Sequence, residues 1–238
     1  MNEKFLKKQI ITYMGNKRKF VTIISKIVDD VKQELNGKDL VLADGFSGSG
    51  IIARLFKIKG VSLHVNDIAG YSQTLNKCYL STPTTKQQKR IEKLIAKANK
   101  FAYSEDTIKY DKWIQLHWAP SGNITKDQRV YYTEKNGKLI DRYRSFINSL
   151  AENDKPFILA PLLVEASIHN NTNGQFSAFY KDEQGVGKFG GKKEVDIKRI
   201  TTPIKLPLPI FSPSPCNVNV SRMDTNQWIK DIPEVDLV

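Results

Sequence analysis

The sequence predicts an α/β protein built on a doubly wound parallel sheet that is interrupted by a long, mostly helical insertion. Short apolar runs that suit buried parallel strands alternate with helical patterns over residues 40–65. A glycine-rich turn, DGFSGSG, joins the first of these runs to the helix that follows it. A strand, a glycine turn, a helix and a second strand form the usual opening of such a sheet.

Residues 1–80 contain this opening. Apolar residues recur at helical spacing up to Leu35. Asn36-Gly37 follows, and both residues tolerate the left-handed conformation that ends a helix. The expected elements are a helix at 18–36, a strand at 40–43, a helix starting at 51 and a strand at 61–65.

The character of the chain changes over residues 81–207. Apolar residues at helical spacing predict amphipathic helices around 91–98 and 139–150. The apolar run 157–168 is expected to be buried, and the stretch rich in glycine and lysine, 181–193, predicts a mobile loop.

The remaining residues return to the sheet pattern. Prolines between positions 203 and 215 predict an extended connector. Beyond it, 218–221 predicts a third strand, TNQWIKDI a short helix, and 235–238 the start of a fourth strand. The predicted domains are a first core part (1–80), an insertion (81–207) and a continued core part (208–238).

Positive charge is concentrated in the first two parts of the chain, and the net charge is +12. Basic and acidic residues number 13 and 7 in 1–80, 22 and 14 in 81–207, and 2 and 4 in 208–238. Because excess positive charge attracts polyanions, nucleic acid is the expected partner. A soluble protein that is merely basic is the alternative.

The sequence lacks the signals of membrane and secreted proteins. No apolar run approaches the roughly 20 residues of a membrane span, and no apolar segment follows the basic N-terminus. Cys78 and Cys216 lie far apart and outside any histidine cluster, so neither a disulfide nor a metal site is expected. A reducing cytoplasm therefore fits best, and Cys216 is expected to be structural.

The glycine turn is the main candidate for a ligand site, since glycines let the backbone and the helix amides approach a ligand closely. Gly48 and Gly50 begin a GxGxx(G/A) pattern, with Asp67 about 20 residues further on, so a nicotinamide oxidoreductase is one interpretation. Asp44 and Phe46 favour another, because a carboxylate at the end of the strand can pair with an ammonium group.

Three blocks together resemble the DNA adenine-N6 methyltransferases, a family that includes many restriction-modification enzymes. YMGNKR (13–18) resembles the family's N-terminal cofactor block, DGFSGSG (44–50) its cofactor loop, and Asn66-Asp67 its acidic position after the second strand. The resemblance implies a Rossmann-like core that binds S-adenosylmethionine, with a carboxylate facing the methionyl amine and an acid holding the ribose hydroxyls. The residues implied in cofactor binding are Tyr13, Gly15, Lys17, Asp44, Phe46, Gly48, Gly50, Asp67 and Asp224.

Asp224 is a softer match than the others. It follows the third strand, where the family places an acidic or amide group against the adenine amine of the cofactor. Thr225 stands where family members often have an aromatic residue. Asp224 also precedes TNQWIKDI as a helix N-cap, and the two roles can coexist.

The family's catalytic motif, Asp-Pro-Pro-Tyr after the fourth strand, does not occur in the sequence. In the family this motif binds the adenine amine, and its tyrosine stacks on the flipped-out base. We therefore name no catalytic residue and interpret the chain as the N-terminal portion of such an enzyme. Its fourth strand would form an exposed edge, so we expect marginal stability or pairing with a second polypeptide.

Residues 81–207 occupy the place of the family's target-recognition region, and the resemblance through this insertion is looser. Basic side chains there would neutralise phosphates of double-stranded DNA, and amides would read adenine edges. The alternative for the loop lysines is a solvated loop, and His169 is expected to be a hydrogen-bonded structural residue. The candidate DNA-binding residues are Asn170, Asn171, Lys181, Lys188, Lys192 and Lys193.

The predicted function is that of a site-specific DNA adenine-N6 methyltransferase in a bacterial restriction-modification system, acting beside a cognate restriction endonuclease. The alternative is a non-catalytic subunit that binds cofactor and DNA, or an inactive remnant. The two hypotheses differ only in what lies outside this chain.

Overall fold

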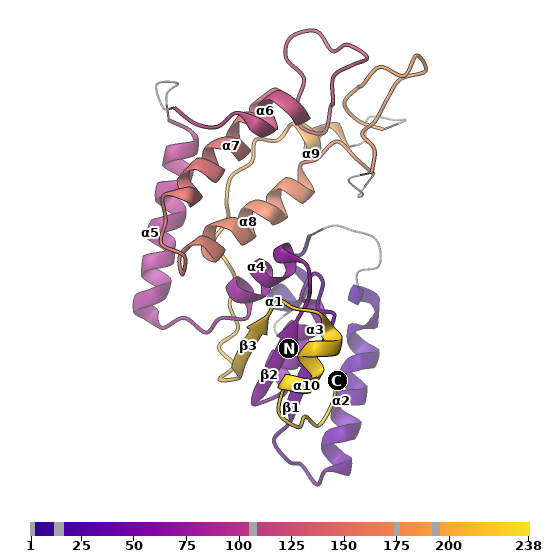
Figure 1. The fold of residues 1–238 in the computed structure, drawn as a ribbon, viewed down its shortest axis with the longest axis vertical. Coiled ribbons are helices and arrows are strands. Elements are labelled where there is room, and N and C mark those ends of the chain that lie inside the picture. The colour runs from indigo at the N-terminus through magenta and orange to yellow at the C-terminus, as the bar shows by residue number, and fades with distance from the viewer. Residues whose placement is uncertain (1–2, 12–16, 105–108, 174–176, 192–195) are drawn as a thin grey trace. The chain divides into compact units, whose positions relative to one another are not determined.

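The structure is a computed structural model, shown in Figure 1, in which two compact units can be described separately. The sheet unit comprises Met1–Ile10, Gly15–Gln88 and Pro209–Val238, and the helical unit comprises Ile11–Met14 and Lys89–Leu208. The residues that the structure describes are 3–11, 17–104, 109–173, 177–191 and 196–238.

The sheet unit is built on parallel strands in the order β1-β2-β3. In the register of the sheet, Val41 pairs with Ser62, and Ser62 pairs with Asn217. Three of the four predicted strands are confirmed to within about a residue at either end, and at the fourth, 235–238, the structure has only an isolated bridge. The three confirmed strands are β1 (Val41–Asp44), β2 (Ser62–Asn66) and β3 (Asn217–Ser221).

The end of the chain lies on the other side of β1. Leu237 forms an isolated parallel bridge with Leu42, and its carbonyl oxygen accepts the Ala43 N–H at 2.9 Å. The Asp236 N–H donates to Val41 O at 2.8 Å. The direction in which successive strands are added therefore reverses at β1, and doubly wound sheets bind their ligands at such a reversal.

Helices pack around these strands. Helix α3 contacts β1 and β2, α2 packs on α3, and α4 contacts β3. The core consists of apolar side chains from β1, β2 and α3 together with α1 and α2. The helices of the sheet unit are α1 (Glu3–Lys7), the 3-10 helix η1 (Lys17–Phe20), α2 (Val21–Glu34), α3 (Ile51–Lys59), α4 (Gly70–Tyr79) and α10 (Thr225–Asp231).

Helix α2 ends where the sequence predicts, because Asn36 and Gly37 both adopt positive φ angles of 55° and 80°. Its apolar face is only partly buried. Phe20, Ile23 and Ile27 are 53%, 59% and 45% exposed. The side chains of α2 that are fully buried are Val21, Ser25 and Val28.

A buried arginine ties the N-terminal segment to α3. Arg54 is 1% exposed, and its Nη1 donates to Phe5 O at 2.9 Å and to Lys8 O at 2.7 Å. Its Nη2 donates to Gln9 O at 2.8 Å, and the guanidinium lies 4.4 Å from the centroid of the Tyr79 ring. Burial lowers the pKa of Arg54 to about 10, so the group stays charged at neutral pH.

The helical unit contains most of α5 together with four further helices. Helix α6 packs on α7, and α7 packs on α8. Helices α5 and α7 confirm the two predicted amphipathic helices, and the apolar run 157–168 lies within the largely buried α8. The bounds are α5 (Thr85–Ala102), α6 (Trp113–Trp118), α7 (Glu134–Asn148), α8 (Lys155–Ile168) and α9 (Ile197–Thr201).

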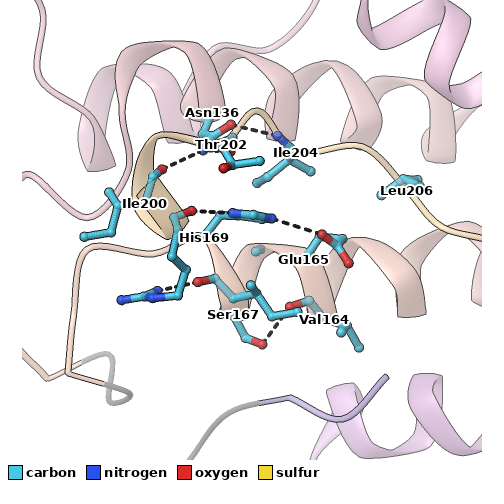
Figure 2. A network of polar contacts seen from close by, with 12 residues as sticks. Asn136, Val164, Glu165, Ser167, His169, Ile200, Thr202, Ile204 and Leu206 are labelled. Atoms are coloured by element: carbon cyan, nitrogen blue, oxygen red, sulfur yellow. Dashed lines mark hydrogen bonds and ion pairs between the residues drawn. The ribbon is translucent and has the colours of Figure 1, made fainter. Parts of the chain in front are cut away.

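Two asparagine side chains, one buried and one half-buried, hold the proline-rich connector, which has no helix or strand from 203 to 216, as predicted. The Ile204 N–H donates to Asn136 Oδ1 at 2.9 Å, as Figure 2 shows, and the Leu206 N–H donates to Asn99 Oδ1 at 3.0 Å. Hydrogen bonding by side chains therefore replaces a sheet ladder along this segment.

The described part of the predicted loop at 181–193 has internal backbone structure, and its mobility stays a prediction. Lys181 and Gly187 form an antiparallel bridge. The Asp182 carboxylate accepts the N–H groups of Gln184 at 3.0 Å and Val186 at 2.8 Å. An acidic side chain that bonds its own turn in this way stabilises that turn, which a count of glycines does not reveal.

Both cysteines are buried and unpaired, and Cys216 belongs to the apolar core of the sheet unit, which confirms its structural role. Among the described residues, every helix is too short or too polar to cross a membrane.

Candidate functional site

The carboxyl ends of the strands carry most of the predicted cofactor residues. Asp44 ends β1, Asp67 follows the end of β2, and Asp224 follows β3. Burial raises the pKa of the Asp44 carboxyl group, and the charge of Lys17, the first residue of η1, opposes that rise. The sheet thus brings together acidic groups that lie far apart in the sequence.

The turn after β1 requires glycine. Gly48 and Gly50 have φ angles of 50° and 78°, which side chains rarely tolerate. A Cβ atom on Gly50 would also lie 2.4 Å from Asn76 Oδ1. The turn closes through the Gly50 N–H, which donates to Ser47 O at 2.7 Å.

Hydrogen bonds among buried polar residues support this turn, and they were not predicted from the sequence. Ser47 Oγ donates to Asn66 O at 3.1 Å and lies 3.0 Å from Ser72 Oγ. Asn76 Nδ2 donates to Ser47 Oγ at 2.9 Å. All four residues are at most 7% exposed. Helix α4 is rich in polar residues, so no pattern in its sequence marks Ser72 and Asn76 as the buried ones.

Asp67 fixes the turn from the neighbouring strand. Its Oδ2 accepts the Gly48 N–H at 2.8 Å, and its Oδ1 accepts the Ala69 N–H at 2.9 Å. A carboxylate oxygen can accept a second hydrogen bond, and Asp67 is half-buried rather than closed off. The side chain can therefore hold the turn and still accept donors from a ligand.

Asp44 is the least satisfied acidic group of the site. The residue is 8% exposed, and its Oδ2 has no hydrogen-bond partner among the described residues. Burial raises the pKa of Asp44 from 3.8 to about 6, against the opposing effects of Lys17 and of the Phe46 and Ala53 backbone amides. A buried carboxylate oxygen without a hydrogen-bond partner is costly, which suits a site whose donor arrives with a cationic ligand.

Large apolar side chains stand beside these carboxylates. Phe46 and Ile68 follow the ends of β1 and β2 and are 74% and 69% exposed. Phe46 was predicted and Ile68 was not, although an isoleucine directly after the acid of a polar turn is unusual. Together they supply apolar surface on which a planar ring can rest.

Asp224 caps a helix, as one of its two predicted roles requires. The side chain of Asp224 accepts the Asn226 N–H at 2.8 Å at the start of α10, and the residue remains exposed. The next residue, Thr225, donates from Oγ1 to Gly45 O at 2.9 Å. This bond ties α10 to the loop after β1. Four predicted residues lie outside the described part of the chain, namely Tyr13, Gly15, Lys192 and Lys193.

The asparagines predicted to read DNA are buried in the helical unit. Asn170 and Asn171 are 1% and 0% exposed. Asn171 Nδ2 donates to Val130 O at 2.8 Å and to Lys188 O at 2.7 Å, and its Oδ1 accepts the Gly190 N–H at 3.0 Å. The amide of Asn171 therefore holds the loop at 188–190, whereas Asn170 Nδ2 donates to Ser167 O at 3.0 Å. The burial of both side chains argues against direct contact with bases.

The two described loop lysines are better placed than these asparagines to contact DNA. Lys181 is exposed, and its Nζ lies 5.2 Å from the centroid of the Phe179 ring, whereas Lys188 is half-buried. Phe179 ends a row of aromatic rings with neighbouring centroids 4.7–6.1 Å apart. The other members of the row are Trp113, Trp118 and Tyr131.

His169 is the hydrogen-bonded structural residue that the sequence predicts (Figure 2). Its Nδ1 lies 2.6 Å from Arg199 O, and its Nε2 lies 3.1 Å from a Glu165 carboxylate oxygen. Both partners are acceptors, so both ring nitrogens must donate, as only an imidazolium does. Burial lowers the pKa of His169, but the bonds to Glu165 and Arg199 O outweigh it, and the net pKa is raised.

Comparison with known proteins identifies the family. Residues 13–192 match the D12 class N6 adenine-specific DNA methyltransferases. The chain belongs to this family. The match covers the glycine turn, Asp67 and most of the helical unit.

The curated relatives that the chain matches are DNA modification methyltransferases. The chain is 26% identical over 228 residues to the type II methyltransferase M.NlaIII of Neisseria lactamica, a match that covers 93% of the chain and 61% of that relative. Modification methylase StsI of Streptococcus sanguinis is 26% identical over 180 residues, covering 71% of the chain and 26% of the relative. Modification methylase LlaI of Lactococcus lactis subsp. lactis is 24% identical, covering 71% and 27%. No solved structure matches the chain.

Replacing the buried carboxylate should stabilise the protein. Burial makes the pKa of Asp44 higher in the folded protein than in the unfolded chain. The contribution of this carboxyl group to the free energy of unfolding is therefore fully present below pH 3.8 and is lost as pH rises through about 6. We therefore expect Asp44→Asn to gain about 1–3 kcal/mol at pH 7.5, with the gain vanishing toward pH 4. Urea unfolding between pH 4 and pH 7.5 measures this gain in the free energy of unfolding. The substitution Asp39→Asn, at an exposed position, is the control. A difference that does not change with pH contradicts the prediction.

The His169 pair should stabilise the protein only while the ring is charged. Its raised pKa means that the contribution is fully present below pH 6.5 and is lost as pH rises through the folded-state value. We expect His169→Gln to cost about 1–3 kcal/mol at pH 6 and less at pH 9. Chemical denaturation at both pH values tests this, with exposed His117→Gln as the matched control. Equal losses at pH 6 and pH 9 would show that the charge plays no part.

Proposed function

We propose that the chain is the cofactor- and DNA-binding portion of a site-specific DNA adenine-N6 methyltransferase in a restriction-modification system. The observation that carries this proposal is the unpartnered Asp44 Oδ2, buried at the point where the strand order reverses. Family membership makes S-adenosylmethionine the ligand to test against that site.

The chemistry of the site fits this ligand. Its methionyl ammonium group is the cation that Asp44 lacks, and its ribose hydroxyls are donors of the kind that Asp67 can still accept. Gly48 and Gly50 allow the backbone to approach closely. When bound, S-adenosylmethionine supplies an electrophilic methyl group. The other residues assigned to its site are Tyr13, Gly15, Lys17, Phe46 and Asp224.

The domain assignment follows the same proposal. Residues 1–80 and 208–238 are the two parts of the methyltransferase core, and 81–207 is the target-recognition region for double-stranded DNA. Lys181 and Lys188, with Lys192 and Lys193, are assigned to phosphates. The protein acts in the cytoplasm beside its cognate endonuclease.

We further propose that the Asp-Pro-Pro-Tyr motif and the remaining strands come from additional polypeptide. The chain spans 61% of the Neisseria lactamica relative. Phe20 and Ile23 of the sheet unit are more than half exposed, and Leu237 is held by a single bridge. These surfaces are what further strands would cover.

Calorimetric titration with S-adenosylmethionine tests the site. We expect the wild-type chain to bind, and Asp44→Asn to weaken binding by about tenfold or more, because a neutral amide cannot pair with an ammonium group. Asp39→Asn should leave the affinity unchanged. NADH binding that S-adenosylmethionine does not displace would instead support an oxidoreductase.

Methyl transfer from labelled S-adenosylmethionine to unmethylated duplex DNA tests the missing portion. The chain alone should transfer no label, because no residue in it can activate the adenine amine in the way the family motif does. Adding a polypeptide that carries Asp-Pro-Pro-Tyr should restore transfer. Label entering adenine with the chain alone would mean that a group within residues 1–238 performs the reaction. Binding without any restoration would favour the non-catalytic subunit.

A further inference from the structure

Four lysines form a row on one side of α5, the long helix at the edge of the helical unit in Figure 1. They are Lys89, Lys93, Lys97 and Lys100, and all are exposed. At 3.6 residues per turn they fall within an arc of about 80°, and they extend over about 16 Å of the helix. We call these four side chains the lysine ridge.

The ridge lies opposite the face by which α5 packs. The buried side chains of the helix are Ile91, Ile95, Ala98 and Ala102, each at most 4% exposed. Their mean direction is about 170° from that of the ridge around the helix axis. The lysines therefore point away from the core and are not needed to bury it.

None of the four ammonium groups has an ion-pair or hydrogen-bond partner among the described residues. The contrast within α5 is Arg90, which lies outside the ridge and forms an ion pair with Asp154. Arg90 thus has an acidic partner, whereas the four ridge lysines have none among the described residues.

Leaving the ridge bare costs stability. Lys89 and Lys93, and Lys93 and Lys97, are separated by four residues, and Lys97 and Lys100 by three. Like charges at these spacings repel on a helix. The four lysines repel one another and do not pack against the core. Binding of an anionic partner would neutralise their charges and explain why they lie together.

We propose that the lysine ridge lies along the phosphate backbone of double-stranded DNA and supplies affinity that does not depend on base sequence. One strand carries a charge about every 3.4 Å along the duplex axis, so the ridge matches the rise of roughly five phosphates. Such contacts position a protein on DNA and leave the reading of bases to other residues. The inference rests on the proposed function and assigns a surface to it.

Neutralising three ridge lysines tests this in the full chain. For K93Q/K97Q/K100Q, binding to a 30-base-pair duplex is followed by fluorescence anisotropy over a salt series. We expect the slope of log K against log [salt] to become shallower by about 3, with affinity about tenfold weaker or more at low salt. The melting temperature should stay the same or rise, because repulsion is relieved. The arginine variant K93R/K97R/K100R should bind as wild type does.

A matched triple separates position from net charge. K4Q/K26Q/K230Q removes the same charge from exposed sites of the sheet unit and should leave the salt slope close to wild type. A loss of equal size in this control, or no loss in the ridge triple while wild type binds, overturns the inference and leaves the proposed function standing. A wild-type chain that binds no duplex DNA overturns both. Tighter ridge-dependent binding to single-stranded RNA assigns the ridge to RNA and overturns the DNA inference.

Discussion

The burial of the Asp44 carboxylate at the end of β1 is the constraint around which the sheet unit is arranged. The turn that follows needs glycine at positions 48 and 50, because both adopt positive φ angles. Asp67 holds that turn from β2, and Thr225 holds its first glycine from α10. The residue after β2 and helix α10 thus each contribute a bond to the loop that follows β1. Burial raises the pKa of Asp44, so the protein carries a cost that a cationic ligand would remove.

Other buried polar side chains differ from Asp44 because their polar atoms are hydrogen-bonded to backbone groups. Arg54 donates to three carbonyl oxygens, and Asn136 and Asn171 each bond several backbone groups. Among the described residues, Asp44 is the only acid with a buried oxygen that lacks a partner. The difference between a structural and a ligand-binding polar group is therefore visible in the hydrogen bonds and not in the residue type.

Two exposed surfaces differ in the partner that their chemistry suits. The apolar side chains on α2, with Phe20 and Ile23 more than half exposed, suit a polypeptide that excludes water. The lysine ridge on α5 suits a polyanion, because its charges have no partner among the described residues. The first surface would suit the proposed additional polypeptide and the second the proposed DNA contact.

The sequence by itself determined the strands, the left-handed end of α2 at Asn36-Gly37, the glycine turn and the acids at the strand ends. These features depend on spacing and on the conformational freedom of single residues, which are local properties. The burial of Asn171 and the support of the turn by Ser47 and Asn76 become visible only in the tertiary structure. An amide in a loop offers the same donors and acceptors whether it faces DNA or a carbonyl oxygen, and the partner is set by chain segments far away in the sequence.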